Sequence, residues 1–143
     1  MASPVDDPTT LPAERLTAHQ PPALLVERVL TLDASGGSVR LKVHGGLDAL
    51  QLLEGGAQAI AVLMGARMRR DGTGSSASGM LVGAKDVVVA RGARAAEGVV
   101  IRTTCTHELG PLQLHAVVAT SEIDGAELMR GELKVAATGG GAT

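Results

Sequence analysis

Aromatic residues are absent from this chain, which has no phenylalanine, tryptophan or tyrosine among its 143 residues. A core must therefore be built from aliphatic side chains and methionine, which remove less area from water per residue than aromatic rings do. Hydrophobic residues still make up 45% of the chain, and its length fits one domain. The smaller core side chains make further burial by dimerisation more plausible.

Cysteine is nearly absent as well. The single Cys105 excludes an intrachain disulfide and fits a reducing compartment. We expect it in the core, because no neighbouring residue obviously lowers the pKa of its thiol for nucleophilic work. The four histidines lack the short spacings of zinc ligands, so no metal site is predicted.

Charge and hydropathy exclude further classes of protein. A net charge of −2, a pI near 6.1 and the absence of stacking rings argue against nucleic-acid binding. No run of about 18 apolar residues predicts a membrane span, and the first residues do not resemble a secretory signal. We expect a cytoplasmic protein that does not bind a membrane.

Hydrophobic periodicity predicts one long helix over residues 47–70. Glu54 falls within its apolar stripe, where an unpaired charge would cost several kcal/mol and a partner or a proton is required. Such a carboxyl group suits general acid–base chemistry. The alternative is that packing turns Glu54 to a solvated edge. The other members of the stripe are Leu50, Leu53, Ala57, Ile60, Ala61, Met64 and Met68.

Two glycines inside this predicted helix indicate how closely other elements pack against it. Gly55 and Gly56 each cost roughly 1 kcal/mol relative to alanine. We therefore expect an element to pack closely against that side of the helix, as a wrapping sheet would.

Strand patterns surround the helix and predict a single α+β domain over residues 1–143, with 1–10 and 138–143 flexible. Turns are expected at residues 33–37 and at Asp124-Gly125. Near the C-terminus, Leu112, Leu114, Ala116 and Val118 alternate with Gln113 and His115 on a strand expected to be half-buried. The expected strands cover 24–32, 38–43, 80–90, 98–106, 112–121 and 127–136.

Three blocks, in order over residues 19–135, resemble the hot-dog-fold 3-hydroxyacyl-(acyl carrier protein) dehydratases. The first is His19-Gln-Pro21-Pro22-Ala-Leu-Leu-Val-Glu27-Arg28-Val29, and the second is Leu52-Leu53-Glu54-x-x-Ala57-Gln58. The third is Gly79-Met-Leu-Val-Gly83-Ala-Lys-Asp86. The resemblance implies an antiparallel sheet wrapped around one central helix.

The resemblance also implies a reaction. Loss of water from a 3-hydroxyacyl thioester needs an acid for the hydroxyl group, assigned to Glu54, and a base for the C2 proton, assigned to His44. A backbone N–H beside Gly83 is expected to stabilise the enolate oxygen. Substrate contacts are assigned to Gln58, Val82 and Gly83, and no cofactor is implied.

One segment departs from the family pattern. Members usually carry the catalytic histidine in a loop resembling His-Phe-Pro-Gly-His-Pro, whereas residues 43–48 here read Val-His-Gly-Gly-Leu-Asp. The loop is shorter and lacks prolines and an aromatic residue. Strand alternation equally suits an exposed His44. A relative that keeps the fold without the chemistry, and that binds acyl chains or pairs with an active homologue, stays open.

The resemblance further implies a substrate, an assembly and a docking surface. The implied substrate is an acyl chain on the pantetheine arm of acyl carrier protein, in fatty-acid, polyketide or polyene biosynthesis. The implied assembly is a homodimer or a heterodimer with an active homologue. A thioesterase is the other alternative, since hot-dog thioesterases use a helix carboxylate to activate water. Carrier docking is assigned to Arg67, Arg69, Arg70 and Lys85, although the arginines also suit the C-terminal end of a helix.

Overall fold

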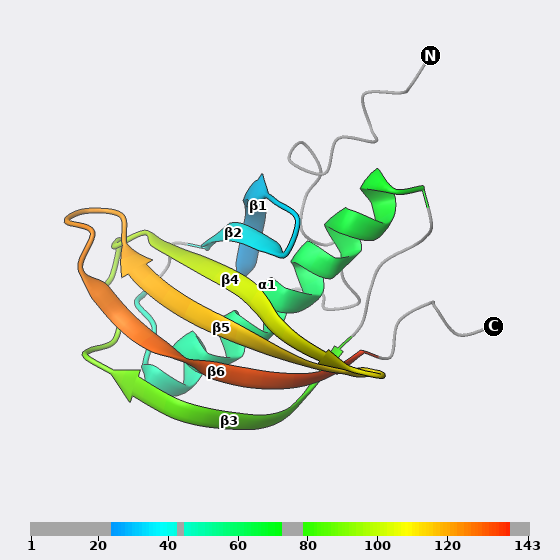
Figure 1. Ribbon diagram of the computed structural model, residues 1–143. Helices are drawn as coiled ribbons and strands as arrows, with labels where there is room; N and C mark the ends of the chain where they lie inside the picture. The colour runs from blue at the N-terminus through cyan, green and yellow to red at the C-terminus, as the bar shows by residue number, and fades with distance from the viewer. Residues whose placement is uncertain (1–23, 43–44, 73–78, 138–143) are drawn as a thin grey trace, which may run out of the picture.

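The chain forms one helix and six strands in a computed structural model that describes residues 24–42, 45–72 and 79–137. The elements are β1 (Val26–Leu32), β2 (Gly36–Leu41), α1 (Ala49–Arg70), β3 (Gly79–Val89), β4 (Val99–Leu109), β5 (Leu112–Ser121) and β6 (Glu127–Ala137) (Figure 1). Each predicted element is present, and no bound differs by more than three residues. The predictions that fall on residues 1–23, 43–44 and 138–143 lie outside the described residues.

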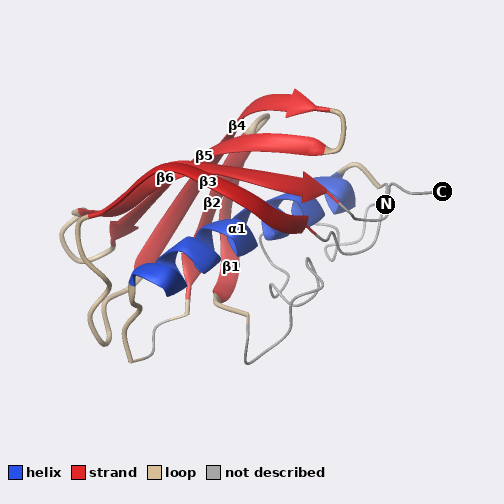
Figure 2. Cartoon of the chain, turned by 90° about the horizontal axis from the view of Figure 1, so that it is seen from below, coloured by secondary structure: helices blue, strands red, loops and turns tan. Residues whose placement is uncertain are grey.

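The six strands form one antiparallel sheet in the order β1-β2-β4-β5-β6-β3. β1 and β3 are therefore the two edges, and the long hairpins β4–β5 and β5–β6 make the centre. Figure 2 shows the sheet curving over one side of α1. The predicted α+β class, with a sheet wrapped around one long helix, is confirmed.

The start of α1 is set by a capping box. Asp48 Oδ1 accepts a hydrogen bond from the Gln51 amide at 2.8 Å, and Gln51 Oε1 accepts one from the Asp48 amide at 2.9 Å. This exchange satisfies two donors that the helix itself leaves unpaired. The helix is long and apolar enough to cross a bilayer by composition, but 61% of its most apolar window is buried, as in a core helix.

The two glycines of α1 lie where the helix meets the sheet most closely. A Cβ atom at Gly55 would lie 3.0 Å from Leu41 Cδ1, and one at Gly56 would lie 3.1 Å from Val117 Cγ1. The prediction of close packing on that side is confirmed, because the glycines admit side chains from β2 and β5. The core around this contact includes Leu24, Val26, Val39, Leu52, Ile60, Leu63, Ile101, Leu128, Met129 and Leu133.

The apolar stripe predicted for α1 is not its most buried face. Leu50 is 75% exposed and Glu54 is exposed, whereas Leu52, Gly55 and Gly56 are buried. The helix is apolar around most of its circumference, so periodicity did not single out one face. The glycines select the side that faces the sheet because the strands approach the helix most closely there. In the single chain, Glu54 lies at a solvated edge.

The predicted inward face of β5 was wrong. His115 is buried at 4% exposure and Val117 at 1%, whereas Ala116 is exposed. Both faces of this strand carry apolar residues, and Val117 packs toward Gly56 of the helix. His115 therefore shares the inner face with Val117, two residues further along the strand. On β6, Met129, Leu133 and Val135 are buried, and Arg130 and Lys134 on the other face are exposed.

Candidate functional site

Glu54 lies one turn into α1 and is held by a neighbour on the same helix. Gln58 Nε2 donates a hydrogen bond to Glu54 Oε1 at 3.2 Å. The carboxylate is otherwise exposed in the single chain. It is thus oriented by Gln58 and open to a substrate or to a second subunit.

Gln58 acts within the chain and is not placed at a surface. Its side chain is 1% exposed, and its Oε1 accepts a 2.6 Å hydrogen bond from the Leu25 amide, just before β1. The amide group thus connects the entry to β1 with Glu54 on α1. Its assignment as a substrate contact is corrected to one of support, because both ends of the amide are occupied by this chain.

His44 lies outside the described residues. The backbone on either side of it is anchored. The Lys42 amide donates to the Leu25 carbonyl at 2.8 Å, and Leu47 exchanges two hydrogen bonds with Ala93 at 2.8 and 2.9 Å.

Gly83 and Val82 lie on the edge strand β3. Gly83 lines a depression of about 270 Å³ together with Ala84, Lys85, Leu114, Glu132 and Lys134. Since Leu133 faces the helix, its neighbours Glu132 and Lys134 face away from it, and the depression opens on the outer face of the sheet. Within one chain, the structure does not bring Gly83 together with Glu54.

The four basic residues assigned to carrier docking do not form one surface. Arg67 turns inward, and its Nη2 donates to the Asp33 carbonyl at 3.2 Å. Arg70 is exposed beside Asp71, and Arg69 is half-buried at the same end of α1. Lys85 lies on β3, beside the outer depression. The grouping of the arginines with Lys85 is therefore corrected, because the arginines lie on α1, on one side of the sheet, and Lys85 lies on the other side.

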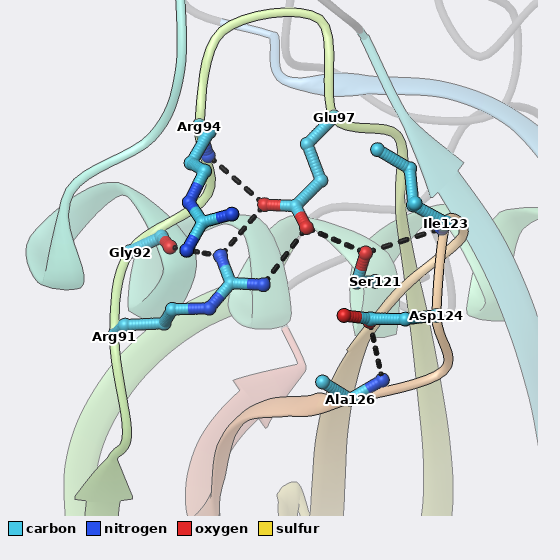
Figure 3. Close-up of polar contacts among 8 residues, drawn as sticks. All are labelled: Arg91, Gly92, Arg94, Glu97, Ser121, Ile123, Asp124 and Ala126. Atoms are coloured by element: carbon cyan, nitrogen blue, oxygen red, sulfur yellow. Dashed lines mark hydrogen bonds and ion pairs between the residues drawn. The ribbon is translucent and has the colours of Figure 1, made fainter.

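Among the described residues, the buried carboxylate is that of Glu97. Its Oε1 and Oε2 accept from Arg91 Nη1 at 2.7 Å and Nη2 at 2.8 Å, and Ser121 Oγ donates to Oε2 at 2.6 Å (Figure 3). The Arg94 amide adds a fourth bond at 3.0 Å. The Arg91 guanidinium, followed by Ser121 and the Arg94 amide, holds the pKa of Glu97 far below its usual range. The carboxylate is therefore ionised at neutral pH.

Sequence reasoning missed Glu97 because it lies in no periodic element. The one local signal is that Arg91 and Arg94 precede Glu97 by six and three residues. In a tight loop, this spacing brings the Arg91 guanidinium and the Arg94 backbone amide to the carboxylate. The loop also places Ala96 at φ +64°, a conformation that costs energy for a residue with a Cβ atom.

A second polar cluster lies between α1 and the β4–β5 hairpin. Burial, with a smaller effect of the Arg67 charge, lowers the pKa of His115 to about 4, so the ring is neutral at pH 7. Its Nε2 is hydrogen-bonded to Gln113 Oε1 at 2.8 Å, and its buried Nδ1 has no hydrogen-bond partner among the described residues. Burial raises the pKa of the Cys105 thiol.

Cys105 is half-buried, so its expected place in the core is corrected in part. Its raised pKa agrees with the expectation that it is not a catalytic nucleophile. Among the described residues, no group of three or more His, Cys, Asp or Glu side chains is arranged to hold a metal ion.

An antiparallel sheet wrapped around a central helix that carries a glutamate defines a hot-dog protein. The chain belongs to the ApeP-like dehydratase family, whose model, described as ApeP dehydratase, matches residues 11–139. A search of functionally curated proteins finds no match.

Solved structures agree with the fold. The dehydratase heterocomplex ApeI:P from Xenorhabdus doucetiae matches with a TM-score of 0.80 at 22% identity, over 89% of this chain and 91% of that chain. The PaaI protein of Escherichia coli, from a phenylacetic acid degradation operon, matches with a TM-score of 0.62 at 13% identity. The match covers 82% of this chain and 83% of that chain. A hypothetical thioesterase from Streptococcus pneumoniae, with coenzyme A, matches with a TM-score of 0.58 at 13% identity, over 78% of this chain and 85% of that chain. At these identities the structures show the fold alone.

Proposed function

We propose that this chain is a dehydratase subunit that acts on 3-hydroxyacyl thioesters carried by acyl carrier protein, in fatty-acid, polyketide or polyene biosynthesis. The observation that carries the proposal is Glu54. In a chain of a dehydratase family, this glutamate lies on the central helix and accepts a hydrogen bond from Gln58 at 3.2 Å, which supports its assignment as the acid.

Glu54 gives the leaving hydroxyl group its proton, and His44 removes the proton from C2. A second subunit that covers Glu54 would shield it from water and let its carboxyl group keep the proton it donates. Gly83 offers a backbone position that a thioester can approach, because its outer side is free of side chain. No step needs a cofactor.

We propose that the second subunit pairs with β3. This edge strand has 11 residues, and Val82 and Val88 on it are 47% and 59% exposed. The opposite edge, β1, has 7 residues and carries Glu27 and Arg28. A long edge strand with exposed apolar side chains is a template for pairing with another strand. A homodimer is the primary assembly.

A second candidate is a subunit that has lost its own chemistry and supports an active homologue. Two observations favour it: a solved relative is a heterocomplex, and the segment around His44 is short and lacks prolines. A carrier protein would meet such a pair at a basic surface, for which Arg69 and Arg70 at the end of α1 are the candidates. Thioester hydrolysis is the third candidate.

Mass spectrometry of a 3-hydroxyacyl carrier-protein thioester separates these functions. The purified protein is assayed beside Glu54→Gln, His44→Ala and the matched control Glu127→Gln, which alters an exposed carboxylate on β6. Loss of one water by the wild type and the control, but by neither site variant, supports the dehydratase. Release of free acid indicates a thioesterase. Unchanged substrate that reacts only after a homologous hot-dog subunit is added supports the second candidate.

A further inference from the structure

Three loops meet at the end of the sheet where α1 begins, and Glu97 joins them. They are the β3–β4 connection (residues 90–98), the β5–β6 turn (residues 122–126) and the segment before the helix (residues 45–48). Glu97 is 6% exposed, and it is the one buried acidic side chain in the part of the chain that the structure describes.

The first two loops are joined through Ser121. Its Oγ donates to Glu97 Oε2 at 2.6 Å and accepts from the Ile123 amide at 3.1 Å (Figure 3). The Glu122 amide also donates to the Gly98 carbonyl at 2.8 Å. Glu97 therefore holds the β3–β4 connection on the end of β5.

The third loop is joined through the backbone. Leu47 and Ala93 exchange hydrogen bonds at 2.8 and 2.9 Å, and Arg91 Nη1 also donates to the Gly92 carbonyl at 3.0 Å. A Cβ atom at Gly92 would overlap the Leu47 carbonyl oxygen, so the two backbones touch. Leu47 directly precedes Asp48, the residue that caps α1.

The connection carries two local costs. A charge is buried at Glu97, and Ala96 beside it has φ +64°. Strained conformations persist where the surroundings over-determine them, and here Glu97 accepts four hydrogen bonds. A buried ion pair is by itself weak evidence for stability, whereas removing one partner leaves an uncompensated buried charge. Both energetic costs lie in the β3–β4 connection, which contacts the segment leading into α1 through Ala93 and Leu47.

We propose that Glu97 is a positioning residue that fixes the path of residues 45–48 and, through them, the start of the helix that presents Glu54. Glu97 acts through Arg91, Ala93 and Leu47 and does not touch the reacting atoms. The catalytic consequence rests on the proposed function, whereas the structural linkage does not.

The test compares Glu97→Gln with Glu127→Gln. Glu127 also receives two hydrogen bonds from one arginine, Arg130, at 2.6 and 2.8 Å, but it is exposed and lies on β6. Amide hydrogen exchange is measured by NMR at Leu47 and Ala93 and at core amides of β4 and β5. Dehydration kcat and KM are measured in parallel, well below each unfolding temperature.

In Glu97→Gln we expect exchange at Leu47 and Ala93 to be at least about tenfold faster, with core amides unchanged. We expect kcat to fall about tenfold while KM changes less than about twofold, because positioning acts on the transition state. Glu127→Gln should match the wild type in both measurements. If Glu97→Gln does not fold, Ser121→Ala, which keeps the charge pair, should show the same pattern with smaller amplitude.

Exchange at Leu47 that stays at the wild-type rate, or rises only as much as at the core amides, overturns the proposal. If exchange responds as expected while kcat of an active wild type is unchanged, the catalytic role is overturned. If the wild type does not dehydrate any 3-hydroxyacyl thioester, the proposed function fails, and the exchange data alone decide whether Glu97 positions the helix.

Discussion

Gln58 joins Leu25 to the helix by a 2.6 Å hydrogen bond across 33 residues of sequence, and the same amide group orients Glu54. The segment that enters β1 and the candidate catalytic carboxylate thus share one buried side chain. Disturbing it should affect stability and activity together.

Gln58→Leu should lower the free energy of unfolding by about 1–3 kcal/mol, because the buried Leu25 amide loses its acceptor. It should also lower the dehydration rate, since Glu54 loses the group that orients it. Chemical denaturation and thioester turnover measure the two effects. Ser38→Ala is the control: it removes the 2.6 Å hydrogen bond between Ser38 Oγ and Thr31 Oγ1 in the β1–β2 hairpin, so stability should fall by about 1 kcal/mol with little change in turnover. Equal turnover losses in the two variants would contradict the orienting role.

Gly83→Ala should leave stability nearly unchanged and reduce turnover. A Cβ atom there would meet only Lys134 Cβ at 3.8 Å, which is an ordinary contact, and the backbone is not in the left-handed region. If the thioester approaches this strand, the methyl group obstructs it. Thermal unfolding together with kcat/KM measures both effects. Ala84→Ser on the same strand is the control, and wild-type turnover in Gly83→Ala would exclude the strand from the substrate path.

His115 should make the protein less stable as the pH falls from about 6.5 to about 4. Its folded pKa is about 4 and its usual value is 6.5, so the unfolded chain takes up the proton first. Stability is therefore fully present above pH 6.5 and is lost progressively down to pH 4, by up to about 3 kcal/mol.

Denaturation midpoints of the wild type and His115→Gln, measured over this range, isolate the effect. The difference between the two proteins should shrink as the pH falls, because only the wild type loses the contribution of a neutral ring. His107→Gln, an exposed histidine on β4, serves as the control and should follow the wild type. Parallel curves for the wild type and His115→Gln would show that burial does not hold the ring neutral.

Val88→Asp should convert the assembly to single subunits. Val88 is 59% exposed on the β3 edge, and a charge in a paired strand interface is costly. Light scattering after size exclusion gives the mass directly. Leu109→Asp, at the end of the β4–β5 hairpin and 63% exposed, should leave the mass unchanged. A wild type that is already a single subunit would contradict the homodimer and direct attention to a homologous partner.

The elements and the family were predictable from the sequence because they depend on local patterns. A few neighbouring residues are enough to recognise each of these features. They are the alternating pattern of the strands, the Asp124-Gly125 turn and the run from Leu52 to Gln58. Gly55 and Gly56 even indicated the close approach of the sheet, since glycine inside a helix is costly without a packing reason.

The orientation of individual side chains was decided by tertiary structure. The helix is apolar around most of its circumference, so periodicity could not tell which side the sheet would cover, and Glu54 proved exposed in the single chain. His115 turned inward because both faces of β5 carry apolar residues. Glu97 is buried by partners from its own loop and from β5, a meeting that no local pattern encodes. The sequence by itself determined which elements form, through short-range propensity and spacing. Only the folded chain decided which carboxylate is buried, because burial depends on what the rest of the chain packs against it.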